Sequence, residues 1–309
     1  MTVRDILRAY EAQYVASHGD RMPPVERRAC AEMAACGTAA LGSHTWLCDS
    51  CGELQVAYNA CRNRHCVRCG GRRRAVWLER VRQRLLPIQH FHLVFTLPHG
   101  ELGTLLLANR RALLGLLFRA AWQSLRKLAR DPKHLGAKLG VLMVLHTWGQ
   151  LLDLHAHLHC VVTSGGLSPE GQWVSSREDY LVCVQALSRL FRGKFLCGLK
   201  QLWREGKLKL EGKLAALKDE GAWEAWLTAL YQTDWQVYAK APVSAAGGPE
   251  QLLKYLARYV AGVAISDKRI ESLGDDRVTI RWKDYRTGQP GEPRSLPLLE
   301  FIQIGRAHV

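Results

Sequence analysis

Histidines alternate along one apolar segment of the sequence in a pattern that could bind a metal ion. Asp153, His155, His157 and His159 recur at every second position, and the positions between them are mostly apolar. On a β-strand these polar side chains would project from one face while the apolar ones meet a core. Two imidazoles at i and i+2 on a rigid strand can hold one divalent cation and leave positions open for substrate oxygens. The alternative is that the histidines are packing residues.

A metal hydrolase with an H-x-H-x-D-H motif is a competing interpretation of the same histidines. Cys160 stands where such a hydrolase would need a histidine after aspartate, and no aspartate separates the histidines. The sequence therefore does not favour hydrolase chemistry at this strand.

A cluster of cysteines near the N-terminus predicts structural zinc. Cys48-x2-Cys51 and Cys66-x2-Cys69 are separated by fourteen residues, and two residues between thiolates let both sulfurs reach one tetrahedral ion. Four more candidate ligands are interleaved with these pairs and leave open a second zinc ion: Cys36, His44, Cys61 and His65. Buried free thiols are the alternative. We expect the folding of this short region to depend on metal.

Two tyrosines downstream have helical spacing. Gln251, Tyr255 and Tyr259 follow one another at intervals of four residues, which aligns them on one helix face. Such a pair is usually part of a core. A tyrosine hydroxyl can also attack phosphorus if a cation polarises the phosphate, and the histidine strand offers a site for that cation.

The charge balance favours nucleic acid as the partner. The 309 residues include 43 Lys and Arg against 28 Asp and Glu, a formal net charge of +15 with a pI near 9.6. An arginine run follows the cysteines and is opposed in that stretch by Glu79 alone. We expect its first members to contact DNA, the alternative being a solvated helix face: Arg62, Arg64, Arg68, Arg72, Arg73 and Arg74.

The sequence favours a cytoplasmic location. The most apolar stretch, Leu102 to Ala121, contains three arginines, which argues against a membrane span, and residues 1–10 lack the apolar core of a secretory signal. In a reducing compartment the ten cysteines are expected to be ligands or buried thiols rather than disulfides.

The remaining sequence predicts the elements that position these residues. We expect strands at 92–98, 140–146, 154–163, 235–240 and 278–282, with helices at 101–130, within 184–230 and from Pro249 to about Gly262. Strands and helices alternate without a regular βαβ repeat. The expected fold is α+β: a zinc-binding, basic domain at 1–86, then a sheet domain at 87–309 with a helical insertion at about 184–232.

The combination of motifs resembles one known class of enzymes. His157-Leu158-His159 together with Tyr255-x3-Tyr259 is similar to the HUH class of tyrosine single-strand DNA endonucleases. When the cysteine-rich N-terminal region is included, the chain resembles the two-tyrosine rolling-circle insertion-sequence transposases from about Cys36 to about Gln303. Four further segments carry this resemblance: Tyr58–Cys66, Phe91–Pro98, Leu256–Tyr259 and Val263–Ser266.

The resemblance implies a fold and a mechanism. The implied fold is an antiparallel sheet flanked by helices. The implied enzyme cuts one DNA strand at element ends and targets without ATP, through a 5′-phosphotyrosine intermediate. His157 and His159 would be ligands of a catalytic Mg²⁺ or Mn²⁺, and Tyr255 and Tyr259 the nucleophiles. The third ligand stays open among His146, Gln150 and His155. His155 ranks below the other two because three neighbouring ligands on one strand would strain the coordination geometry.

The chain departs from the family pattern at two places. Tyr259 is followed by Val-Ala-Gly rather than by a polar, basic continuation, and Gly262 could shorten the helix. Relatives continue beyond Gln303 with a basic segment, so we expect a truncated C-terminus.

The competing function is that of a noncatalytic zinc-dependent nucleic-acid-binding protein. A third function, a zinc hydrolase of small molecules, would have no use for the basic N-terminal region.

Overall fold

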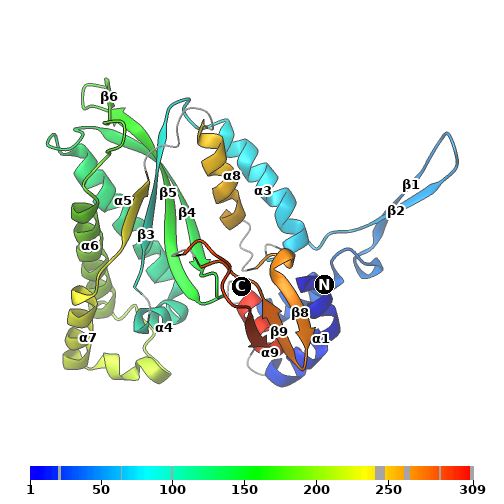
Figure 1. Ribbon diagram of the computed structural model, residues 1–309. Helices are drawn as coiled ribbons and strands as arrows, with labels where there is room; N and C mark the ends of the chain where they lie inside the picture. The colour runs from blue at the N-terminus through cyan, green and yellow to red at the C-terminus, as the bar shows by residue number, and fades with distance from the viewer. Residues whose placement is uncertain are drawn as a thin grey trace. The chain divides into compact units, whose positions relative to one another are not determined.

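The chain forms two compact units (Figure 1). The computed structural model describes residues 1–19, 22–63, 65–98, 100–240, 248–260, 265–284 and 287–306. The first unit combines Met1–Arg80, Trp148–Asp153 and Ala257–Val309, and the second combines Val81–Thr147 and Leu154–Leu256. Each unit therefore contains segments that are distant in sequence.

A five-stranded sheet forms the centre of the second unit. Its strand order is β4-β5-β3-β7, and β6 pairs with the end of β5. Strand β3 pairs antiparallel with both β5 and β7. The expected α+β class with an antiparallel sheet is confirmed. The strands are β3 (His90–Thr96), β4 (Lys138–Trp148), β5 (Leu154–Leu167), β6 (Trp173–Ser175) and β7 (Val237–Lys240).

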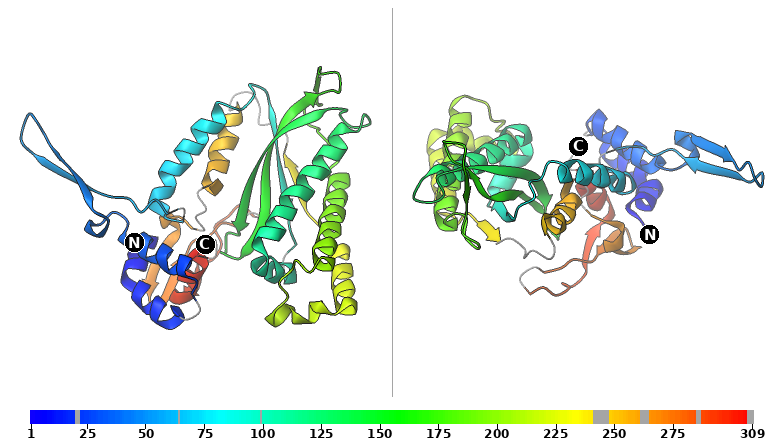
Figure 2. Two further views of the ribbon diagram at one scale, coloured as in Figure 1. Left: turned by 180° about the vertical axis from the view of Figure 1, so that it is seen from behind. Right: turned by 90° about the horizontal axis from the view of Figure 1, so that it is seen from above.

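One face of this sheet is a hydrophobic core. Phe91, Leu93 and Phe95 on β3, with Leu158 and Cys160 on β5, are almost fully buried beneath helices. Full burial of a leucine or phenylalanine side chain contributes roughly 1.5–3 kcal/mol. Both views in Figure 2 show the long helices on this side of the sheet. The helices are α4 (Glu101–Ala108), α5 (Arg110–Arg130), α6 (Val184–Arg204) and α7 (Glu220–Gln232).

The opposite sheet face carries the alternating histidines. Because side chains alternate along a strand, burial of Leu158 and Cys160 in the core places His157 and His159 on the other side. Thr96 is the register partner of His157 and Val94 that of His159, so the same face of β3 continues to His92. The expected arrangement of this strand, with the histidines on one face and the apolar side chains on the core face, is confirmed.

The expected single helix at 101–130 is instead two helices that meet at Asn109. Asn109 is buried with non-helical dihedrals, φ −129° and ψ 37°. Its side-chain amide donates to the carbonyls of Leu105 and Lys209, both at 3.1 Å, and its carbonyl oxygen accepts from the Lys209 amide at 2.7 Å. Asparagine competes well with backbone hydrogen bonding, so this side chain ends α4 and ties the junction to the segment after α6. The helical segment at 184–232 is also divided, by the 3-10 helix η3 (Gly212–Lys218).

The first unit joins the two ends of the chain. Its core contains Ile6, Tyr14 and Met33 from the N-terminal helices together with Val278 and Phe301 from the C-terminal region. A three-stranded antiparallel sheet of order β10-β9-β8 packs in this core. Its elements are α1 (Val3–His18), α2 (Pro24–Ala35), η2 (Ala39–Leu41), β1 (Ser43–Leu47), β2 (Leu54–Tyr58), η4 (Asp267–Arg269), β8 (Ile270–Gly274), β9 (Arg277–Ile280), β10 (Arg294–Pro297) and α9 (Leu298–Arg306).

Two helices extend across the division between the units. They are α3 (Val67–Arg82) and α8 (Gly248–Val260). The compact units thus divide the chain differently from the expected boundary after Leu86, because strands β8–β10 and α9 share a core with α1 and α2. No helix among the described residues is both long and apolar enough to cross a membrane.

Candidate metal centres and nucleophile helix

Three histidines bring their ring nitrogens together on the sheet face opposite the hydrophobic core. His146 comes from β4, and His157 and His159 come from β5. His146 Nδ1 lies 3.1 Å from His157 Nε2, which lies 3.1 Å from His159 Nε2. Ligand nitrogens at about 2.0–2.1 Å from one metal ion are separated by about 2.9–3.4 Å. The donor set therefore fits a divalent metal.

Burial keeps the His159 imidazole in the neutral form that binds metals. His159 is 4% exposed, and burial, followed by the charges of His157, His92 and His146, lowers the pKa of its ring to about 2. His157 Nδ1 lies 2.7 Å from the backbone oxygen of His155. A hydrogen bond there places the proton on Nδ1 and leaves Nε2 free to coordinate.

His92 on β3 is a neighbour of this cluster that the sequence analysis missed. Its Nε2 lies 3.0 Å from His159 Nδ1 and can fix the orientation of that ring. Burial, with a smaller contribution from Lys240, lowers the pKa of His92 to about 4. The available signal was the alternation of His90 and His92 along the apolar strand.

The candidates for the third ligand are separated by the structure. His146 joins His157 and His159, and all three ligand nitrogens lie within 4.8 Å of one another. The ring of His155 lies beside His157, with centroids 4.9 Å apart, but outside that set. Gln150 lies in the turn between β4 and β5.

Helix α8 places Tyr255 against the histidines. The ring centroid of Tyr255 is 5.8 Å from that of His159 and 5.9 Å from that of His92, in edge-on arrangements. Leu253, Leu256 and Ala257 are buried on this helix, whereas Tyr255 is half-buried. Glu250 at its first turn forms an ion pair with Arg82 of α3 at 3.1 Å.

Tyr259 follows Tyr255 by one turn on the same continuous helix and is also half-buried. Residues four apart lie on the same face of a helix, as the sequence spacing predicts. Gly262, which was expected to affect the end of this helix, lies outside the described residues.

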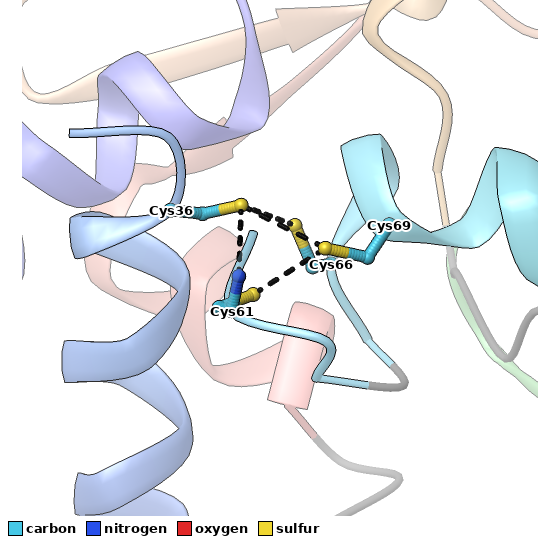
Figure 3. A group of neighbouring side chains, drawn as sticks. All are labelled: Cys36, Cys61, Cys66 and Cys69. Atoms are coloured by element: carbon cyan, nitrogen blue, oxygen red, sulfur yellow. Dashed lines mark hydrogen bonds between the residues drawn. The ribbon is translucent and has the colours of Figure 1, made fainter. Parts of the chain in front are cut away.

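Four cysteines of the first unit form a compact cluster (Figure 3). The Sγ atom of Cys36 lies 3.7 Å from those of Cys66 and Cys69, and Cys61 Sγ lies 3.7 Å from Cys69 Sγ. These separations are far above the bond length of a disulfide, about 2.0 Å. Four sulfurs at about 2.3 Å from a tetrahedral zinc ion would lie about 3.8 Å apart. The cluster therefore fits one structural zinc ion.

Backbone geometry supports this arrangement of thiols. The amide of Cys61 donates to Cys36 Sγ at 3.5 Å, and the amide of Asn63 donates to Cys61 Sγ at 3.4 Å. Such bonds stabilise thiolates. Burial raises the pKa of the Cys66 thiol to about 11, so zinc binding at neutral pH would displace its proton.

The expected grouping of Cys48 and Cys51 with Cys66 and Cys69 does not occur in the structure. Cys48 and Cys51 lie at the exposed turn between β1 and β2, and Cys48 Sγ contacts Ser50 Oγ at 3.1 Å. Five residue pairs from Ser43↔Tyr58 to Leu47↔Leu54 separate that turn from the base of the hairpin, a length of about 15 Å. Cys36 and Cys61 take their places in the cluster.

The other predicted zinc ligands also lie outside the four-sulfur cluster. His44 is exposed on β1, and His65 is buried beside Cys66 in sequence. Among the described residues, the two groups suited to metal binding are the four cysteines and the three histidines.

The arginine run forms an exposed helix. Arg68, Arg72 and Arg73 are exposed on α3 and Arg74 is half-buried, while Gly70 is the one buried residue among those described in this helix. Arg62 precedes the helix with φ 56°, and its carbonyl accepts a hydrogen bond from Arg73 at 3.2 Å. Arg64 lies outside the described residues. The exposed cations are placed where a phosphate backbone could reach them.

Comparisons with known proteins identify the family. Residues 140–309 match the family Y2_Tnp, described as "Putative transposase", and residues 6–97 match Zn_Tnp_IS91, described as "Transposase zinc-binding domain". No solved structure matches the chain. The expected resemblance to insertion-sequence transposases with an N-terminal zinc-binding domain is confirmed.

Two curated relatives agree with these matches. The chain is 44% identical over 308 residues to "Putative transposase y4qJ" of Sinorhizobium fredii, covering 99% of this chain and 76% of the relative. It is 30% identical over 270 residues to "Transposase for insertion sequence element IS801" of Pseudomonas savastanoi pv. phaseolicola, covering 85% of this chain and 62% of that relative. The chain therefore belongs to the Y2_Tnp transposase family and carries the IS91-type transposase zinc-binding domain at residues 6–97.

Proposed function

We propose that this chain cuts and rejoins single-stranded DNA at the ends of a rolling-circle mobile element through a 5′-phosphotyrosine intermediate. The observation that carries the proposal is the convergence of three imidazole nitrogens beside the ring of Tyr255. A set of three imidazole donors, two of them buried, next to a half-buried tyrosine combines the two groups that attack on a phosphodiester needs.

The reaction exchanges one phosphodiester for another. The Tyr255 hydroxyl attacks phosphorus, a Tyr–O–P bond forms, the bond from phosphorus to the 3′ oxygen breaks, and that oxygen leaves with a proton as a 3′ hydroxyl. Because the phosphotyrosine keeps a phosphodiester linkage, resealing needs no ATP. Mg²⁺ or Mn²⁺ held by His146, His157 and His159 would withdraw charge from the phosphate oxygens when bound.

The protein side chains hold the reacting groups in position. His92 orients His159, and the carbonyl of His155 orients His157, so the Nε2 atoms point to one place. The second tyrosine, Tyr259, supplies a second nucleophile on the same helix face. One tyrosine can then hold a cleaved 5′ end while the other attacks a second strand.

The zinc cluster and the arginine helix supply DNA binding in this proposal. The four cysteines fix the start of α3, from which Arg68, Arg72 and Arg73 project into solvent. Phosphate contacts of this kind position a strand without reading its sequence. A cytoplasmic location would keep the thiols reduced and available for zinc.

Covalent trapping tests the proposal. The full chain is incubated with single-stranded DNA carrying candidate element ends, with Mg²⁺ or Mn²⁺, and separated by denaturing electrophoresis. A protein–DNA adduct is expected with both tyrosines present. No adduct with either ion across the element ends would favour the noncatalytic zinc-dependent binding protein instead.

Two histidine variants test the proposed ligand set. His157→Ala should abolish the adduct while zinc content and circular dichroism stay unchanged, because the zinc site is in the other unit. His155→Ala, on the same strand face but outside the three-nitrogen set, should retain most of the adduct. Loss of zinc and of the folded sheet in His157→Ala would make the site structural and contradict the nuclease mechanism.

A further inference from the structure

Two helices of the second unit contain no acidic residue. Helix α5 has six Lys and Arg residues in 21 and α6 has five in 21, and neither contains Asp or Glu. The two helices pack against each other on the core side of the sheet. Their cations are Arg110, Arg111, Arg119, Arg126, Lys127 and Arg130 on α5, and Arg189, Arg192, Lys194, Lys200 and Arg204 on α6.

A groove of about 660 Å³ lies between these helices and collects part of this charge. Five cations line it, and Glu205 is its one acidic lining residue. Glu205 forms an ion pair with Lys207 at 2.7 Å and accepts a hydrogen bond from the side chain of Gln201 at 2.8 Å. Within the described part of the chain, no carboxylate forms an ion pair with the remaining four: Arg119, Lys127, Arg189 and Lys194.

The groove opens on the side of the helices that faces away from the sheet. Phe191 of α6 packs on Phe95 of β3, with ring centroids 5.1 Å apart, and marks the sheet-facing side. Arg189 and Gly193, two positions before and after it, lie on the opposite side of the helix. The sheet and its helical layer therefore separate this groove from the histidine cluster.

The groove suits an extended chain of phosphates rather than stacked bases. Its floor includes Gly193, where an added Cβ would meet nothing within 4 Å, and Gly198, where an added Cβ would lie 2.3 Å from Leu116. No aromatic residue lines it, so it lacks the stacking platforms that bind bases. From Arg189 to Gln201 the lining extends about 18 Å along α6.

We propose that this α5–α6 groove binds the sugar-phosphate backbone of a single DNA strand without regard to base sequence. A positively charged groove that follows one phosphate backbone is a feature of proteins that bind single strands without sequence preference. The choice of DNA as the ligand rests on the proposed function. The inference that the groove binds a phosphate chain rests on its charges and is independent of that function. A strand held here would be distinct from the one at the histidines and could be a flanking or target strand.

Binding measurements with charge-matched variants test the groove. The full chain binds an unstructured, labelled single strand between 50 and 300 mM salt, with no divalent ion added, so that cleavage does not contribute. The groove variant carries Arg119→Gln, Lys127→Gln, Arg189→Gln and Lys194→Gln. The control variant removes the same charge from exposed cations of the same unit outside the groove: Arg111→Gln, Lys133→Gln, Lys213→Gln and Lys218→Gln.

The two variants should differ in salt dependence. Each phosphate of a single strand that is no longer neutralised reduces the log–log salt slope by about 0.7, so the groove variant should be shallower by about 2–3 and bind at least about tenfold more weakly near 0.1 M salt. The control should stay close to the wild type. Equal weakening in both variants, or unchanged binding in the groove variant, would overturn the proposal.

A chemical footprint localises the strand. Cys197 is exposed and lines the groove, whereas Cys183 at the start of α6 lies outside it. Bound single-stranded DNA should slow alkylation of Cys197 several-fold, measured by mass spectrometry, and leave Cys183 unaffected. Equal rates at Cys197 with and without DNA would contradict the proposal. Because both experiments measure binding alone, their outcome is separate from the adduct test of the proposed function.

Discussion

At the residue scale, the histidine cluster depends on burial combined with directed hydrogen bonds. An imidazole that is buried among other imidazoles cannot easily gain a proton, and His159 is such a ring. The backbone oxygen of His155 faces Nδ1 of His157, and His92 faces Nδ1 of His159. These two neighbours leave the Nε2 atoms of His157 and His159 facing each other at 3.1 Å, where both can bind one metal ion.

The two tyrosines should have separable roles. Tyr255→Phe and Tyr259→Phe singly should each leave some covalent cleavage but impair strand transfer, and the double variant should form no adduct, because phenylalanine keeps the ring and removes the nucleophile. Denaturing gels with a second, differently labelled strand measure both steps. An adduct in the double variant, or strand transfer at the full rate in either single variant, would contradict a mechanism with two nucleophiles.

The buried histidines should make stability depend on pH. The pKa of His92 is lowered by burial to about 4 and that of His159 to about 2, against about 6.5 in an unfolded chain. Below pH 6.5 the unfolded state binds more protons, so stability falls as pH falls, by up to about 1.4 kcal/mol per pH unit for each histidine. Urea unfolding at pH 7, 6 and 5 without divalent ions measures this decrease. His92→Gln should flatten the dependence; an unchanged slope in that variant would show that His92 does not titrate on unfolding.

At the scale of elements, the β1–β2 hairpin separates cysteines that the sequence spacing would unite. Its two strands pair without a break from Ser43↔Tyr58 to Leu47↔Leu54. The turn with Cys48 and Cys51 is therefore held away from the hairpin's base, next to which Cys61 lies in sequence. The same hairpin leaves Trp46 and Leu47 exposed.

Cysteine variants should distinguish the two groups. Cys61→Ser should lower bound zinc and destabilise the first unit, since structural zinc contributes on the order of 10 kcal/mol in comparable peptides. Cys51→Ser should retain the zinc of the four-cysteine cluster. A metal-binding dye and thermal unfolding report both quantities. If Cys51→Ser loses that zinc and Cys61→Ser retains it, the ligand set is the one expected from sequence rather than the one seen in Figure 3.

The arginine face of α3 should contribute to salt-dependent DNA binding. Replacing Arg72, Arg73 and Arg74 by Ala should make the log–log salt slope for single-stranded DNA shallower by about 0.7 for each phosphate that these arginines neutralise. Adduct formation at low salt should remain, since these residues are not part of the proposed chemistry. An unchanged slope would place the three arginines outside the DNA path.

At the scale of the whole molecule, the two chain ends fold together. Helix α9 packs against α1 and α2, and Val278, Ile280 and Leu296 of the C-terminal strands share their core. Residues 1–86 alone would expose that core to water. We therefore expect the zinc-binding head to need the C-terminal strands for stable folding.

A core substitution near the C-terminus should accordingly affect the N-terminal helices. Phe301 is 3% exposed, and truncating a buried phenylalanine to alanine costs about 3–5 kcal/mol. Phe301→Ala should reduce hydrogen-exchange protection in α1 as well as in α9. Gln303→Ala, at an exposed position of the same helix, is the matched control. Protection of α1 that is unchanged in Phe301→Ala would mean that the head folds independently.

The sequence by itself determined the local features of this protein. The period of two that places His157 and His159 on one strand face, the four-residue spacing of Tyr255 and Tyr259, and the division into α+β elements all depend on backbone repeats within a few residues. The family resemblance followed from the same short motifs. One local prediction failed, at Asn109, because its side chain binds a segment one hundred residues away.

Only the tertiary structure decided which distant residues meet. His146 reaches His157 because β4 lies beside β5, and His92 reaches His159 because β3 pairs with β5. Cys36 reaches Cys61 because the amide of Gly37, just after α2, donates to the carbonyl of Asn59, just after the hairpin. The joining of the two chain ends and the α5–α6 groove have the same origin. Spacing along a chain fixes which residues share a face of one element, but strand pairing and helix packing choose the neighbours of that face, and these depend on the core of the whole unit.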